Sequence, residues 1–176
     1  MDDVVMSSAS TAPRPFRVLG VQQLAIGAMD KSKLLGLWRD LLGLEVVGQF
    51  QSAKENVDED IAVTGTGPWK VEIDLMQPMD AQASPRVHQP PLNHIGLWVD
   101  KLHEAYSWLQ KKGVRMAPGG IRRGASGFEI CFIHPKANEQ HPLCGEGVLI
   151  ELVQAPESLI EFFEQHASAP IHHDPC

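Results

Sequence analysis

Four polar residues stand at matching places in two similar stretches of the chain, and together they could hold a metal ion. The stretch QLAIGAMD aligns with HIGLWVD, which pairs Gln23 with His94, and VEIDLMQ aligns with VLIELVQ, which pairs Asp74 with Glu151. An amide, an imidazole and two carboxylates are ligands typical of an oxygen-rich octahedral site with positions open for water or substrate. The repeat therefore predicts a divalent metal site at these four residues.

Each of these residues also has an ordinary structural interpretation when it is taken alone. Asp74 could lie on a solvated face of its strand, because side chains alternate between the two faces. His94, on an apolar strand, could be a hydrogen-bonded core histidine. Glu151 shares its face with Leu149 and Val153, which indicates a sheltered position where a carboxylate needs a cationic or hydrogen-bonding partner. The convergence of all four is what favours the metal site.

Two helices and eight strands must position these residues. Apolar residues at helical spacing follow Asp30 and end at Gly43, and the same pattern runs from Asp100 to Gly113, with each aspartate expected to cap and each glycine to terminate its helix. Strands are expected at about 18–26, 45–50, 60–64 and 71–76, then at 93–99, 114–117, 128–133 and 147–153.

The order of these elements predicts an α+β fold of two paired β-α-β-β-β modules that form a curved sheet around a central cleft. The modules span about 18–78 and 92–155, with a proline-rich linker between them and a further helix near 157–165. Residues 18–166 form one domain in this interpretation, after an N-terminal arm at 1–17 and before a tail at 167–176. Equivalent strands of the two modules are expected to face each other across the cleft.

Composition narrows the function classes further. The chain has 176 residues, a formal net charge of -7 and 43% hydrophobic residues, with no basic block and no long apolar run. These features argue against nucleic acid and membranes as partners. The three cysteines form no metal-binding or disulfide pattern, and Asp2 and Asp3 occupy the place where a signal peptide carries positive charge. A cytoplasmic location is expected.

The motifs LNHIGLWVD, FIHPK and GVLIELVQ carry a family resemblance. Over about residues 18–163 the chain resembles the glyoxalase/vicinal-oxygen-chelate superfamily, and within it the methylmalonyl-CoA epimerases most. The resemblance implies one divalent metal ion held by Gln23, Asp74, His94 and Glu151. The family usually has histidine at the first position and Gln or Glu at the second, so this chain's set favours Co, Mn or Mg and slightly disfavours Zn.

The same resemblance implies an epimerase that acts on the α-carbon proton of an acyl-CoA thioester such as methylmalonyl-CoA, through a metal-stabilised enolate. Glu151 is the expected group for proton transfer on one face of the substrate. A second carboxyl group is expected near the start of the third strand, where Asp60 is preferred and Glu59 lies one register away. An acidic surface turn is the alternative for this segment.

Substrate contacts are expected from the loop GGIRRGASG, in which glycines bracket Arg122 and Arg123 and precede a strand, with Ser126 beside them. Arginine pairs well with phosphate through its planar fork, so the loop would suit a small-molecule thioester such as coenzyme A; an exposed glycine-rich turn is the other interpretation. The superfamily also implies a homodimer.

Other functions of the same fold stay open. A lactoylglutathione lyase uses similar metal and carboxylate chemistry, and Gln23 is compatible with a non-catalytic protein that binds a small molecule. An extradiol dioxygenase needs two histidines and a carboxylate on iron, and only His94 stands at a ligand position. Fold alone does not decide among these functions.

Overall fold

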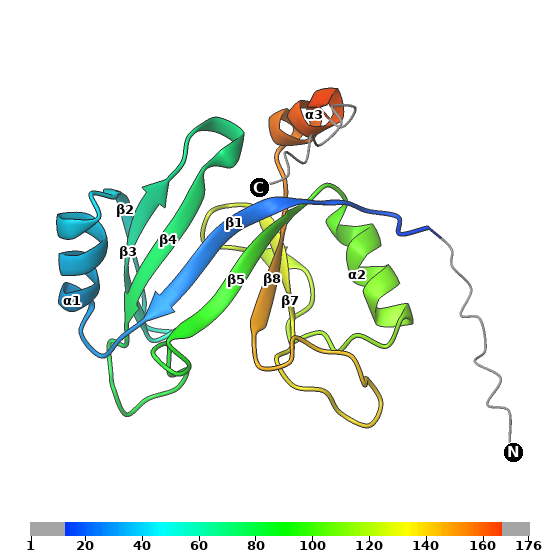
Figure 1. Ribbon diagram of the computed structural model, residues 1–176. Helices are drawn as coiled ribbons and strands as arrows, with labels where there is room; N and C mark the ends of the chain where they lie inside the picture. The colour runs from blue at the N-terminus through cyan, green and yellow to red at the C-terminus, as the bar shows by residue number, and fades with distance from the viewer. Residues whose placement is uncertain (1–12, 167–176) are drawn as a thin grey trace, which may run out of the picture.

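The computed structural model describes residues 13–166, which form a curled sheet with helices outside it (Figure 1). The sheet has eight strands in the order β2-β3-β4-β1-β5-β8-β7-β6. In chain order the elements are β1 (Val18–Gly27), α1 (Lys31–Leu35), η1 (Gly36–Leu41), β2 (Glu45–Ser52), β3 (Val57–Thr64), η2 (Gly67–Trp69), β4 (Val71–Gln77), β5 (Leu92–Val99), α2 (Leu102–Lys111), β6 (Arg122–Arg123), β7 (Glu129–Ile133), β8 (Leu149–Gln154) and α3 (Glu157–His166).

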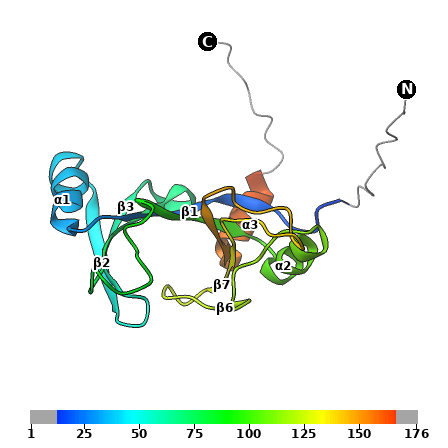
Figure 2. The same ribbon diagram turned by 90° about the horizontal axis from the view of Figure 1, so that it is seen from below.

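The two halves of the sheet repeat one topology, as the sequence predicts. The first strand of each half runs parallel to the last, β1 beside β4 and β5 beside β8, and the other neighbours within each half are antiparallel. The halves join edge to edge, because β1 and β5 pair antiparallel with Leu24 opposite Ile95. Equivalent strands therefore lie in one continuous sheet, and both ends of this sheet curl to the same side (Figure 2).

Each half packs a helix against its convex face and builds a separate apolar core there. Under α1 and η1 the core is formed by Ala62, Ile73 and Leu75, with Leu34, Leu35 and Trp38 packed against it. Under α2 the core is formed by Phe16, Val99, Leu102, Ala105, Cys131 and Leu152. Because side chains alternate along a strand, the neighbours of these core residues, such as Asp74 beside Ile73 and Glu151 beside Leu152, face the concave side.

Both predicted helix ends with glycine are confirmed, and one predicted cap is wrong. Gly43 and Gly113 have φ of 75° and 83°, the left-handed conformation that glycine adopts at little cost. Asp30 caps α1 by accepting a hydrogen bond from Ser32 N at 3.0 Å. Asp100 does not cap α2, because its carboxylate binds the backbone N and the Nε of Arg17, each at 2.7 Å.

Three further differences separate the expected elements from the structure. The first helix changes from α to π geometry at η1, so the two helices are not equivalent. Residues 114–117 make only isolated bridges, through Val114 and Met116, and the short strand β6 takes the corresponding edge position. Phe16, expected in the N-terminal arm, is buried and packs edge-on against Trp108.

Most of the expected arm and all of the expected tail, residues 1–12 and 167–176, lie outside the described residues. Within 13–166, none of the helices has the length and apolar character needed to cross a membrane.

Candidate active site

A cavity of about 450 Å³ lies on the concave face of the sheet and takes its lining from both modules. The first module contributes Gln23 from β1, Glu59 from β3 and Asp74 from β4. The second module contributes His94 from β5, Glu151 from β8, and residues of β6, β7 and the intervening loop. All four residues aligned by the sequence repeat therefore line the same cavity.

Three of the four residues contact one another directly. Gln23 Nε2 lies 2.6 Å from His94 Nε2 and donates a hydrogen bond to Glu151 Oε2 at 2.9 Å. His94 Nε2 and Glu151 Oε2 are 3.4 Å apart. These three atoms come from three adjacent strands, because β1 pairs β5 and β5 pairs β8, with Gly96 opposite both Gln23 and Glu151.

Gly96 makes this convergence possible. The register of β1 against β5 shifts between Val21 and Gln23, so that Gln22 and Gln23 both approach the same stretch of β5. A Cβ atom on residue 96 would lie 2.7 Å from Gln22 Oε1 and from Gln23 Cγ, closer than non-bonded heavy atoms tolerate. Any side chain at this position would displace the glutamine that bridges His94 and Glu151.

The ring of His94 is oriented by two neighbours. Asn93 Nδ2 donates to the Val87 carbonyl at 3.0 Å, which turns Asn93 Oδ1 toward His94 Nδ1 at 2.9 Å. Nδ1 must therefore carry the proton, and the lone pair of Nε2 faces the cavity. Phe132 packs edge-on against the ring, with centroids 5.8 Å apart.

Asp74 completes the set as a buried carboxyl group with 4% of its surface exposed. Burial raises the pKa of Asp74 to about 7; the nearby His94 acts in the opposite direction, and the negative charges of Glu72 and Glu151 add to the rise. Among residues 13–166, none supplies a salt-bridge cation to Asp74. A carboxyl group in these surroundings holds its proton near neutral pH or requires a cation from outside the protein.

Glu59 is the second carboxyl group with a strongly perturbed environment. Its side chain lines the cavity, and burial raises the pKa of Glu59 to about 8, assisted by the negative charges of Asp74, Glu55, Glu151 and Glu72. Glu59 is therefore mostly protonated at neutral pH and can donate a proton into the cavity.

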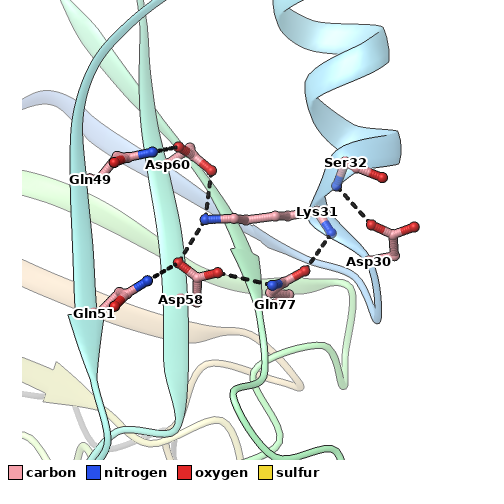
Figure 3. A network of polar contacts seen from close by, with 8 residues as sticks. All are labelled: Asp30, Lys31, Ser32, Gln49, Gln51, Asp58, Asp60 and Gln77. Atoms are coloured by element: carbon pink, nitrogen blue, oxygen red, sulfur yellow. Dashed lines mark hydrogen bonds and ion pairs between the residues drawn. The ribbon is translucent and has the colours of Figure 1, made fainter.

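Asp60, the residue preferred from the sequence, lies on the other face of β3. Its carboxylate binds Lys31 Nζ at 2.7 Å and accepts a hydrogen bond from Gln49 Nε2 at 2.6 Å, on the side that faces α1 (Figure 3). Because side chains alternate along a strand, neighbouring residues cannot both face the cavity. The geometry places Glu59, the alternative of the sequence analysis, in the position expected of Asp60.

The three residues expected to bind substrate all border the cavity. Arg122 and Arg123 form β6, and Ser126 lies in the turn before β7. The guanidinium carbon of Arg122 lies over the Phe132 ring, 5.0 Å from its centroid, and the same ring packs edge-on against His94. The cavity therefore offers positive charge at the edge formed by the second module and carboxyl groups at the edge formed by the first.

The donor set fits a divalent cation when the Gln23 amide is turned so that Oε1, rather than the hydrogen-bond donor Nε2, faces His94 and Glu151. No group of three or more His, Cys, Asp or Glu side chains suited to a metal occurs in the part of the chain that the structure describes, so the convergent set depends on Gln23. The remaining donors are one imidazole and the carboxylates of Glu151 and Asp74, whose mutual repulsion a cation would relieve. Such oxygen-rich sets suit Mn, Mg or Co.

Sequence reasoning missed three contributors to this site. Gly96, Asn93 and Phe132 all stand in the motifs that carry the resemblance, but nothing in a single sequence distinguishes a glycine needed for clearance from one in a flexible turn. The roles of Asn93 and Phe132 depend on the direction of the His94 ring, which only the packed structure defines.

The fold and the cavity define a class of proteins in which paired β-α-β-β-β modules enclose one polar site. Comparison with known proteins agrees: residues 22–132 match the family model of the Glyoxalase/Bleomycin resistance protein/Dioxygenase superfamily. The chain belongs to this superfamily.

The similar proteins include methylmalonyl-CoA epimerases, and this similarity marks the chain as an enzyme of the superfamily. The human mitochondrial enzyme of that name is 28% identical over 141 residues, which cover 77% of this chain and 73% of the human protein. The crystal structure of the Mycobacterium tuberculosis enzyme superposes with a TM-score of 0.63 at 25% identity, covering 82% of this chain and 93% of that one. A Streptomyces coelicolor variant solved with 2-nitronate-propionyl-CoA has a TM-score of 0.65 at 20% identity, covering 80% and 97%, which supports the fold alone.

Proposed function

We propose that this protein is an acyl-CoA epimerase that inverts the α-carbon of a thioester such as methylmalonyl-CoA. The observation that carries the proposal is the pairing of two carboxyl groups in one cavity: Glu59, held protonated by burial, and Glu151, a carboxylate that accepts a hydrogen bond from Gln23. Inversion needs a base on one face of the α-carbon and an acid on the other. The names of the human and mycobacterial relatives support this substrate class.

The two groups would divide the proton transfer. Glu151 removes the α-proton, and the electron pair of the broken C–H bond moves toward the thioester carbonyl, giving an enolate. Glu59 then delivers its own proton to the opposite face of the same carbon, which produces the epimer. The two carboxyl groups exchange protonation states in each turnover, so the reverse reaction begins from Glu59.

A divalent cation bound by Gln23, Asp74, His94 and Glu151 would supply Lewis-acid stabilisation of negative charge at the thioester oxygen. The protein's own part is to hold these ligands in place. Asn93 sets the tautomer of His94, and Gly96 gives Gln23 its clearance.

Substrate orientation would come from the edge of the cavity. Arg122, stacked over Phe132, and Arg123 supply positive charge for the anionic groups of an acyl-CoA, and Ser126 adds a hydroxyl group. This arrangement places negative charge of the substrate near the second module, away from the acidic groups Glu55 and Glu72 of the first module.

The test is incorporation of solvent deuterium at the α-carbon of methylmalonyl-CoA, measured by mass spectrometry with Mn²⁺, Co²⁺ or Mg²⁺ supplied. Glu59→Gln and Glu151→Gln should each lower epimerisation by about 10²–10⁴-fold, the usual contribution of a general acid or base. Glu129→Gln is a matched control, since Glu129 lies on β7, is exposed and pairs with His103.

The outcomes separate the candidate functions. Turnover of a glutathione hemithioacetal without deuterium incorporation into methylmalonyl-CoA would assign the protein as a lactoylglutathione lyase. Ligand binding without either reaction would assign it as a small-molecule-binding protein of the superfamily.

A homodimer is also proposed. The exposed leucines of the first helical segment, Leu37, Leu41 and Leu42, offer apolar surface that a second copy could cover. Light scattering of the purified protein tests this assembly.

A further inference from the structure

The outer face of β3 carries a cation shared between two carboxylates. Lys31 Nζ lies 2.7 Å from Asp58 Oδ1 and 2.7 Å from Asp60 Oδ2 (Figure 3). The three side chains are largely withdrawn from solvent, with 15% of Lys31, 17% of Asp58 and 4% of Asp60 exposed. This group, here called the Lys31 clamp, lies opposite the cavity and borders none of it.

Amide side chains extend the clamp to the neighbouring strands. Gln51 Nε2, on β2, and Gln77 Nε2, at the end of β4, donate to the two oxygens of Asp58 at 3.0 and 2.9 Å. Gln77 Oε1 in turn accepts a hydrogen bond from the backbone N of Lys31 at 3.1 Å. The first residue of α1 is therefore tied through both its backbone and its side chain to strands β3 and β4.

The clamp determines which face of β3 carries which carboxyl group. Asp58 and Asp60 flank Glu59, and the period of a strand sends flanking residues to the opposite side. Holding both aspartates against α1 therefore directs Glu59 into the cavity. The same register sets Glu59 opposite Met76 and Ile61 opposite Asp74, so the ladder fixes β3 against the ligand-bearing β4.

We infer that Lys31 is a positioning residue for the epimerisation, which acts by fixing β3 so that the carboxyl group of Glu59 reaches the α-carbon. The inference rests on the proposed function, in which Glu59 transfers a proton. Without the cation, Asp58 and Asp60 would stand on one sheltered face with like charges, and an uncompensated buried charge disrupts its surroundings. A displacement of about 1 Å at a reacting group can cost about 10²-fold in rate.

The test compares Lys31→Met with Lys31→Arg in the methylmalonyl-CoA epimerisation assay. Lys31→Met should lower kcat by about 10²-fold with KM within about threefold, because a displaced acid weakens the chemical step more than substrate binding. Lys31→Arg keeps a cation that can bridge both carboxylates and should recover most of kcat.

Arg17→Met is the matched control. Arg17 pairs at 2.7 Å with Asp100, which is 5% exposed, so the variant also strips the cation from a buried carboxylate, but in the second module and away from β3. It should lower the urea midpoint of unfolding with little change in kcat. If Lys31→Met does not fold, Asp60→Asn keeps the shape of the clamp, removes one charge and should lower kcat by about tenfold.

A double variant shows whether Lys31 acts through Glu59. Glu59→Gln combined with Lys31→Met should be no slower than Glu59→Gln alone, since the positioned group is already missing. Multiplicative losses, or folded Lys31→Met and Asp60→Asn proteins with wild-type kcat, would overturn the inference while leaving the epimerase assignment intact. A wild-type protein without epimerase activity would overturn both.

Discussion

The two modules share a topology but make different contributions to the cavity. The first supplies two carboxyl groups whose pKa values are raised, Glu59 to about 8 and Asp74 to about 7, both primarily by burial. The second supplies His94, Glu151 in a hydrogen bond with Gln23, and the cation of Arg122. The carboxyl groups with raised pKa values therefore lie on the first module's side of the cavity, whereas the ligands proposed for a cation come from both modules, Gln23 and Asp74 from the first and His94 and Glu151 from the second.

The outer faces of the modules carry their ion pairs in different places, and the pair of the second module, Arg17 with Asp100, lies beyond the end of β5. Beneath α2 the second module packs an apolar core that includes Leu102, Cys131 and Leu152. The first module adds to its own apolar core the buried ion pairs of Lys31 with Asp58 and Asp60. Hydrogen bonds and ion pairs need a definite direction and distance, so they fix the register of a strand more closely than apolar contacts, which tolerate small shifts. Strand β3, which carries Glu59, is therefore held on its outer face by ion pairs as well as by apolar contacts.

The largest expected effect is that of replacing Glu59, because the reaction that remains shows what Glu151 does alone. Glu59→Gln should lower epimerisation by about 10²–10⁴-fold but still permit deuterium exchange with retention in one epimer, because Glu151 can remove and return a proton on its own face. Chiral analysis of the labelled thioester measures this. Exchange in both epimers at wild-type rates would assign the acid role to another group.

A smaller effect, on metal affinity, should follow from filling the space beside Gly96 of β5. Gly96→Ala brings a Cβ within 2.7 Å of Gln23 Cγ, which should push the amide away from His94 and Glu151. We expect divalent-cation affinity to fall by about 10–100-fold, the cost typical of disturbing the support of a ligand set. Calorimetric titration with Mn²⁺ measures the affinity, with Gly20→Ala as control because nothing lies within 4 Å of a Cβ there.

Replacing Gln23 with histidine, the family's usual ligand, should raise metal affinity rather than lower it. Gln23→His provides a second imidazole beside His94 and should tighten binding of late metals such as Zn²⁺ and Co²⁺ more than of Mg²⁺, since nitrogen ligands favour the former. Competition between these metals in the same titration measures the shift in preference. Equal tightening for Mg²⁺ would argue against residue 23 as a ligand.

The smallest expected effect is on how the free energy of unfolding depends on pH. Because the pKa of Glu59 is raised to about 8 in the folded protein, the native state binds more protons than the unfolded chain between the ordinary value of 4.5 and about 8. The contribution of Glu59 to stability should therefore be complete below about pH 4.5 and lost as pH rises through about 8. Urea unfolding in the presence of a chelator measures this: between pH 4.5 and about 8 the free energy of unfolding should change less with pH in Glu59→Gln than in the wild type.

Much of this architecture could be predicted from the sequence alone. The repeat of the motifs defined two modules, the helix stops at Gly43 and Gly113 followed from residue type and spacing, and the alignment brought Gln23 and Asp74 into correspondence with His94 and Glu151. These predictions depend on local periodicity and on equivalence between copies, and both are written directly in the order of the residues.

Tertiary structure decided which groups face the cavity and what holds them there. Period-two alternation states that Glu59 and Asp60 point opposite ways, but which of them points inward is decided by what packs against β3: Ala62 lies in the core beneath α1, and Lys31 pairs with Asp60 on the same face. Asp100 likewise leaves its expected capping role because Arg17 reaches it through the fold. Local pattern sets the alternatives along a chain, and long-range packing and charge pairing select among them.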